Sequence, residues 1–176
     1  RPPEPVEKNL TELPAFIRAQ NCSLGIANDG DADRVAMFDE NGTYVDSHQI
    51  LCLLTRYMAK TKGQKGELVK TVSTTDMMRK QAEAYGLPIS TTPIGFKYIT
   101  EKILSGDVLV CGEESGGIAV KGHLAERDGI YIGLLVAEMC AHRGMKLSEL
   151  VQELFDEFGP HHNYRNDMHT TDDRKN

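Results

Sequence analysis

The sequence has no tryptophan, and aromatic residues make up only 6% of it. It also lacks a long apolar run. The most apolar stretch, residues 129–141, is interrupted by Glu138 and is too short to cross a bilayer. The polar, proline-rich start RPPEPVEKNL has no signal-peptide pattern. These absences predict a protein without a membrane partner, and we expect it to be cytoplasmic.

A structural zinc site and an excess of basic charge are absent as well. The cysteines are widely spaced in the sequence and form no CxxC or Cys/His ligand pattern, which predicts reduced thiols. The formal net charge is −6. A general nucleic-acid surface would need a basic face, so we expect no nucleic-acid partner, although a local basic site for one phosphate is compatible with this charge.

What the sequence does contain is typical of a globular α/β protein. Its 176 residues are 40% apolar and 26% charged, enough for one domain or two small ones. From residue 67 onward, patterns of strands and helices alternate, which predicts a mostly parallel sheet flanked by helices. The expected strands are 67–72, 88–91 and 107–111, with a further one at 117–120, and the helices between them are 73–85 and 96–104.

Three more helices are predicted from apolar periodicity and end signals. One covers about residues 49–60, with a buried stripe. Another covers 128–143, with Asp128 as N-cap, and the last covers 148–158, with Ser148 as N-cap. The expected stripe is Ile50, Leu51, Leu54, Tyr57 and Met58.

The first 46 residues predict a partial α/β domain. A helix over 9–20 is followed by short strands at 24–28, 34–39 and 43–45. The Asn41-Gly42 pair between the last two predicts a β-hairpin, because both positions of a tight hairpin turn favour positive φ. These elements are too few to close a core alone and look like the second half of a domain.

Three aspartates in the motif DGDADR are the first candidate site. Asp29, Asp31 and Asp33 repel one another unless a cation lies between them, and their alternate spacing lets the carboxylates converge from one loop. Carboxylate oxygens suit Mg²⁺ or Ca²⁺. Arg34 would repel a bare metal ion but can pair with a phosphate bound beside it. The structural alternative is a solvated acidic turn between two strands.

An EF-hand is a poor match to the same segment. With Asp29 as position 1, the loop would need glycine at position 6, where Arg34 stands. The flanking segments also read as strands, whereas an EF-hand requires helices.

Three further motifs follow predicted strands or precede a helix. GEESGG, residues 112–117, offers two carboxylates and a hydroxyl on a glycine-rich loop, a set that suits sugar hydroxyls. TPIGFK, residues 92–97, offers a glycine for close backbone approach and Lys97 for an anion. ERDG, residues 126–129, holds Arg127. Taken alone, each of these is also compatible with a solvated loop.

The four motifs in this order resemble those of the α-D-phosphohexomutase superfamily, which includes phosphoglucomutases and phosphomannomutases. The resemblance covers about residues 9–159. It implies that residues 1–46 are the C-terminal half of the family's domain 2, that 47–159 are its domain 3, and that 160–176 lead toward domain 4. Neither a phosphoserine loop nor the family's phosphate-binding loop occurs in the sequence, so we expect a fragment whose partners include the absent domains 1 and 4.

The resemblance also implies roles for individual residues. It assigns Mg²⁺ binding to Asp29, Asp31 and Asp33, and catalysis to Arg34 and, more loosely, Arg127. It assigns substrate binding to the two remaining loops, at Glu113, Ser115, Gly95, Phe96 and Lys97. Some relatives carry Trp or His at the position of Phe96.

The implied reaction interconverts hexose 1-phosphates and hexose 6-phosphates through a phosphoserine and a bisphosphorylated sugar. By resemblance to the family, GEESGG implies glucose or mannose phosphates over N-acetylglucosamine phosphates. Two alternatives are a divalent-metal-binding interaction module, for which the acidic loop alone suffices, and a Mg²⁺-dependent phosphatase. The phosphatase is disfavoured because a strand and a hairpin follow the aspartates where such enzymes have a helix.

Overall fold

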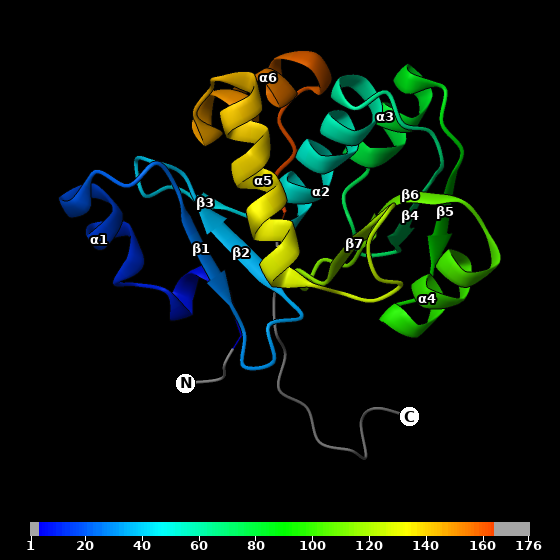
Figure 1. Ribbon diagram of the computed structural model, residues 1–176, viewed down its shortest axis with the longest axis horizontal. Helices are drawn as coiled ribbons and strands as arrows, with labels where there is room; N and C mark the ends of the chain where they lie inside the picture. Colours follow the sequence, from blue (N-terminus) through cyan, green and yellow to red (C-terminus); the bar gives the residue numbers. More distant parts are fainter. Residues whose placement is uncertain (1–3, 164–176) are drawn as a thin grey trace.

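The computed structural model describes residues 4–163, which form two β-sheets and the helices around them (Figure 1). The first sheet is antiparallel, with strand order β1-β2-β3. Its strands are β1 (Gly25–Asn28), β2 (Val35–Phe38) and β3 (Tyr44–Val45).

The second sheet has strand order β5-β4-β6-β7. The central strand β4 is parallel to both of its neighbours, and only β7 runs antiparallel to its neighbour β6. This confirms the mostly parallel sheet that the alternating pattern predicts. The strands are β4 (Glu67–Thr71), β5 (Ile89–Thr92), β6 (Val108–Gly112) and β7 (Ile118–Val120).

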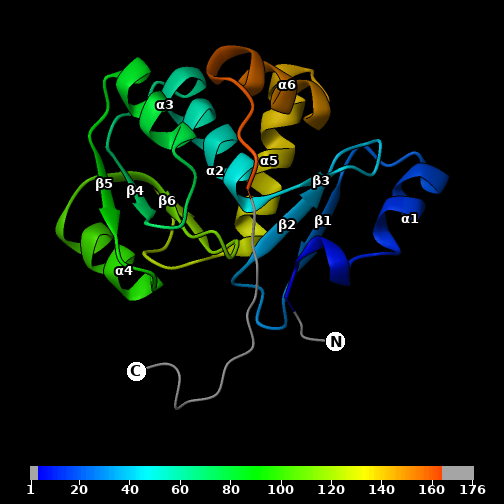
Figure 2. The same cartoon turned by 180° about the vertical axis from the view of Figure 1, so that it is seen from behind.

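Helices cover both faces of the second sheet. Helices α2 (Ser47–Arg56) and α3 (Met77–Tyr85) pack on one face, and α4 (Phe96–Ser105) packs on the other (Figures 1 and 2). Helix α5 (Gly129–Arg143) contacts β1 and β2 of one sheet and β7 of the other, so it joins the two. Helix α6 (Leu147–Phe158) lies against α2 and α3, and α1 (Leu13–Gln20) lies against β1.

One apolar core extends across the two sheets. It contains Met37 of β2, Leu68 of β4 and the whole predicted stripe of α2, every member of which is at most 3% exposed. Tyr57 and Met58 lie in a π-helical turn, Tyr57–Thr61, that continues α2. Among residues 4–163, none of the helices has the length and hydropathy that a bilayer-spanning segment needs.

Several element ends differ from the sequence predictions. Helix α1 begins at Leu13 and not at residue 9, because Pro14 has no N–H and is tolerated only in the first helical turn. Helix α2 begins earlier than predicted, at Ser47, since Asp46 and Gln49 form a capping box. Helix α6 begins at Leu147, ahead of the predicted cap Ser148.

The hairpin between β2 and β3 forms as predicted, but its turn differs. Of the Asn41-Gly42 pair, only Gly42 has a positive φ, of 76°. The buried carboxylate of Asp39 closes the turn by accepting hydrogen bonds from the amides of Asn41 and Thr43, both 2.8 Å. The expected tail, residues 160–176, falls outside the described residues from position 164 onward.

Candidate functional site

The three aspartates of DGDADR lie on a tight turn between β1 and β2. The amide of Ala32 donates to the carbonyl of Asp29 at 3.2 Å, and the amide of Gly129 at the start of α5 donates to the carbonyl of Ala32 at 2.9 Å. One carboxylate oxygen from each of Asp29, Asp31 and Asp33 lies within 4.8 Å of the others. The carboxylates therefore converge, as their spacing predicts.

Two arginines balance part of this negative charge. Arg34 forms an ion pair with Asp29, whose side chain is only 1% exposed, and Arg127 Nη2 lies 2.6 Å from Asp33 Oδ2. Burial acts to raise the pKa of Asp29, but the hydrogen bonds from Arg34 outweigh it and lower that pKa. Burial raises the pKa of Asp33 in spite of Arg127. Asp31 is exposed.

The glycine-rich loop GEESGG is bonded directly to the acidic loop. Arg34 forms an isolated antiparallel bridge with Gly117, and the amide of Val35 donates to the carbonyl of Gly116 at 3.1 Å. Gly116 has a φ of 97°, and a Cβ there would overlap the carbonyl of Val35. The strand ends of the two sheets thus meet at these two loops.

Glu113 connects this loop to TPIGFK and ERDG. Its carboxylate accepts a hydrogen bond from the amide of Gly95 at 2.9 Å and lies 3.6 Å from Arg127 Nη1. Burial raises the pKa of Glu113, which is 5% exposed. Gly95 has a φ of 126°, a conformation that only glycine adopts readily.

The remaining candidates of TPIGFK lie on the first turn of α4 and point to different surroundings. Phe96 is 6% exposed, and its ring centroid lies 5.3 Å from the guanidinium carbon of Arg127. Lys97 is exposed, and its ammonium lies over the ring of Tyr98 at 4.8 Å. The structure therefore places Phe96 beneath Arg127 and Lys97 at the surface.

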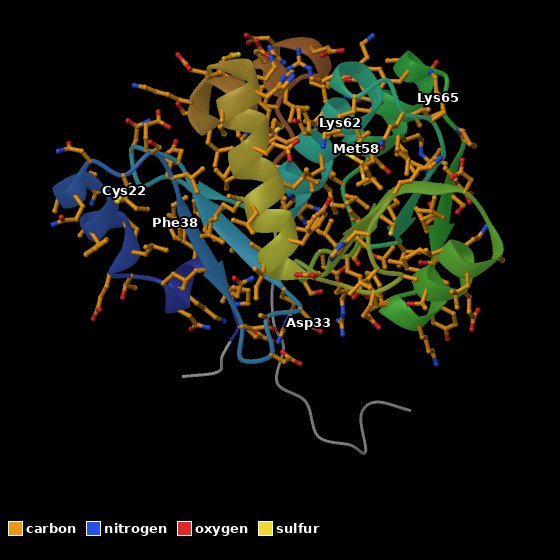
Figure 3. The ribbon with its side chains drawn as sticks, in the orientation of Figure 1. Cys22, Asp33, Phe38, Met58, Lys62 and Lys65 are labelled. Carbon is orange, nitrogen blue, oxygen red and sulfur yellow. The ribbon has the colours of Figure 1, made fainter. Side chains whose placement is uncertain are left out.

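Ser115 lines a cavity of about 700 Å³ between the two sheets, a volume in the range of small-molecule sites. Figure 3 shows Asp33 at the end of the β1–β2 loop, close to the N-terminal end of α5. The polar side chains that line the cavity with Ser115 include Arg34, Tyr44, Ser47, His48, Ser73 and Glu114.

Glu114 is one of the two carboxylates of GEESGG, but the family resemblance assigns it no role of its own. Its carboxylate accepts hydrogen bonds from Ser73 at 2.6 Å and Thr71 at 3.0 Å, while its carbonyl accepts one from Ser47 at 2.6 Å. Burial acts to raise the pKa of Glu114, but these hydroxyl contacts lower it. The sequence predicts a helix start at Ser73, but α3 begins at Met77. The hydroxyl residues Thr71 and Ser73 at the carboxyl end of β4 are the sequence feature from which this cluster could have been predicted, because ligands bind at that end of parallel strands.

The fold and the site together define an α/β/α domain with a carboxylate triad beside a glycine-rich loop. Family models for phosphoglucomutase/phosphomannomutase match two parts of the chain. The alpha/beta/alpha domain III matches residues 46–158, and domain II matches residues 1–42. The chain belongs to the phosphoglucomutase/phosphomannomutase family.

Individual relatives agree with this assignment. A phosphoglucomutase/phosphomannomutase of Thermococcus kodakarensis is 30% identical over 99% of this chain and 37% of its own length. A phosphoglucosamine mutase of Carboxydothermus hydrogenoformans is 36% identical over 82% of this chain and 33% of its own length. A crystal structure of a Thermus thermophilus protein assigned as a phosphomannomutase has a TM-score of 0.84 and 39% identity, covering 89% of this chain and 36% of that one. The chain thus spans about a third of the length of these relatives.

Proposed function

We propose that the chain is the metal- and sugar-binding part of a phosphohexomutase that interconverts the 1- and 6-phosphates of glucose or mannose. In this proposal, domains equivalent to 1 and 4 of the family supply the phosphoserine and a phosphate-binding loop, and the fragment is inactive alone. The observation that carries the proposal is that Arg127 contacts both Asp33 of the acidic loop and Glu113 of the glycine-rich loop. Residues far apart in the sequence thereby form one charged site.

The donor set of the acidic loop fits Mg²⁺. Asp29, Asp31 and Asp33 provide only carboxylate oxygens, which are hard ligands, and they already converge. When bound, Mg²⁺ would offset negative charge on a transferring phosphoryl group. Arg34 is placed to pair with the same group, because it lies on both the acidic loop and the cavity wall.

The hexose would bind along the cavity that Ser115 lines. Ser115 supplies a hydroxyl to this cavity, and Glu113, two residues earlier on the same loop but not part of the cavity lining, supplies a carboxylate. A hydroxyl and a carboxylate match the donors and acceptors of sugar hydroxyls. Gly95 holds Glu113 in place through its amide, and Lys97 on the first turn of α4 is a candidate for an anionic substrate group. Because some relatives are named phosphoglucosamine mutase, glucosamine phosphates should be tested as substrates beside glucose and mannose phosphates.

Titration calorimetry of the chain tests the metal site. We expect Mg²⁺ to bind the wild-type chain and to bind Asp31→Asn much more weakly, because one of three converging carboxylates loses its charge. Asp156→Asn on the exposed face of α6 is the matched control and leaves binding unchanged. Equal Mg²⁺ affinity of wild type and Asp31→Asn would contradict the proposal. Ca²⁺ binding without any preference for hexose phosphates would favour a metal-binding interaction module instead.

A further inference from the structure

Arg127 contacts residues of two loops and of the first turn of α4. Its guanidinium lies 2.6 Å from Asp33 Oδ2 and 3.6 Å from Glu113 Oε2 through two different nitrogens. The ring of Phe96 lies beneath it, 5.3 Å from the central carbon, at a distance typical of a cation–π contact. One side chain therefore joins the acidic loop, the glycine-rich loop and the start of α4.

The surroundings leave the stem of Arg127 little freedom. A Cβ at Gly117 would overlap the Cδ of Arg127, so the arginine occupies the space that this glycine leaves open. The Nε atom of Arg127 is buried and makes no hydrogen bond among the described residues, but it lies 3.7 Å from Oε1 of Glu126, the preceding residue. Phe96 is fixed within the apolar cluster between α4 and the sheet. The two terminal nitrogens are the atoms of Arg127 that lie closest to the carboxylates of Asp33 and Glu113.

Asp33 is the residue where this arrangement meets the proposed metal site. Its carboxylate pairs with Arg127 and also belongs to the converging triad. A divalent cation that draws on the charge of Asp33 repels the guanidinium and weakens its contact with Asp33. Because the ring of Phe96 lies beneath the guanidinium, the interaction of Arg127 would shift toward Glu113. Because Glu113 also accepts the amide hydrogen bond of Gly95, such a change would extend to the TPIGFK loop.

We propose that Arg127 is a positioning residue that couples cation binding at Asp29, Asp31 and Asp33 to the sugar-facing loops through Glu113. The proposal rests on the proposed metal site and goes beyond it, since it predicts that metal binding also changes the contacts of Glu113 and of the TPIGFK loop. By linkage, a ligand that engages Glu113 would alter cation affinity by the same factor.

The coupling can be measured by following backbone amide NMR signals of the chain during a Mg²⁺ titration. Gly30 reports the metal loop itself, and Gly95 reports the loop bonded to Glu113. In the wild type we expect both signals to move with the same Mg²⁺ midpoint. In Arg127→Met, Gly30 still moves but the response of Gly95 is lost. In Arg127→Lys, Gly95 responds more weakly, because one ammonium cannot contact both carboxylates as a planar guanidinium does.

Lys121→Met is the matched control, because it removes a positive charge from the same segment. Lys121 pairs with Asp107, away from Asp33 and Glu113, so this variant retains the Gly95 response. Dispersed amide spectra establish that each variant is folded. The coupling alone is overturned if, in the wild type, the Gly30 signal moves with Mg²⁺ and the Gly95 signal does not. It is also overturned if the Gly95 signal of Arg127→Met moves as much as that of the wild type. A Gly30 signal that stays still in the wild type overturns the metal site and the coupling together.

Discussion

The apolar core around α2 and a charged junction at the N-terminal end of α5 connect the same two sheets by different means. We define the charged junction as Asp29–Arg34, Gly95, Phe96, Glu113–Gly117 and Arg127. The core joins the sheets by burial, since residues of α2 and of both sheets are almost fully inaccessible. The junction joins them through ion pairs and backbone contacts, and its charged side chains Asp33, Arg34 and Arg127 are 21%, 25% and 30% exposed. The comparison indicates that stability comes mainly from the core, while the junction determines where the functional groups lie.

The sharpest test of this division is Leu51→Ala on α2. Leu51 is 0% exposed and packs close to Gly112 of β6. We expect the free energy of unfolding to fall by about 3 kcal/mol, because the truncation loses apolar burial and leaves a cavity. Urea denaturation measures the effect. Leu104→Ala is the control, since Leu104 is 75% exposed and its loss should cost about 0.5 kcal/mol or less. Similar losses for both variants would show that α2 does not dominate stability.

The next largest effect is expected at the backbone of the junction, for Gly116→Ala. A Cβ there meets the carbonyl of Val35 in addition to the strain of a φ of 97°. We expect a loss of about 2 kcal/mol in the free energy of unfolding. Gly86→Ala isolates the cost of the positive φ, because the φ of Gly86 is 62° but no atom lies within 4 Å of the added Cβ. That control should cost about 1 kcal/mol. Equal losses would mean that the close approach of the two loops contributes nothing.

The difference between core and junction also explains what the sequence could predict. The stripe of α2 follows a helical period, so spacing alone identifies Leu51 and Leu54 as buried. The convergence of Asp29, Asp31 and Asp33 was predictable for a similar reason, since one short loop carries all three.

The contacts between loops were not predictable in this way. Ser47 and Glu114 are 67 positions apart, and their hydrogen bond depends on how α2 packs on the sheet. The same holds for Ser73, whose spacing to Asp76 suggests a helix start. Its hydroxyl bonds Glu114 in the folded chain, and no periodicity records that partner. The family resemblance named Phe96 as a sugar-facing residue, whereas its burial beneath Arg127 is a tertiary feature.

A smaller, pH-dependent effect on the free energy of unfolding is expected for Glu40, whose carboxylate joins the β2–β3 hairpin to α6 outside the charged junction. Glu40 at the hairpin accepts a hydrogen bond from the hydroxyl of Ser148 on α6. Burial acts to raise the pKa of Glu40, but the contacts with Ser148 lower it below the ordinary value of 4.5. A lowered pKa in the folded state stabilises the protein above the unfolded-state value. That stabilisation is lost as the pH falls through the folded-state pKa.

We therefore expect Glu40→Gln to reduce stability at pH 7 and to make it less sensitive to pH below about 4.5, relative to the wild type. Urea denaturation between pH 7 and pH 3 measures the difference between the two proteins. Glu101→Gln on the exposed side of α4 serves as the control and should retain the pH dependence of the wild type. A constant difference between Glu40→Gln and the wild type at every pH would show that the Glu40 charge is not coupled to folding.

The smallest change in the free energy of unfolding is expected for Ala32→Gly in the acidic loop of the charged junction, where stability and Mg²⁺ binding can be measured separately. Ala32 has a φ of 60°, which costs an alanine about 1 kcal/mol, and Ala32→Gly removes that strain. Glycine loses more chain entropy on folding, about 0.5–1 kcal/mol, so we expect unfolding to change by less than about 1 kcal/mol. Mg²⁺ affinity should nevertheless fall, because glycine allows this turn more backbone conformations than alanine and so holds Asp31 and Asp33 together less firmly. Calorimetry and urea denaturation on the same variant measure both quantities. A large loss of stability with unchanged Mg²⁺ affinity would reverse the division between core and junction, since Ala32 would then serve the fold and not the metal loop.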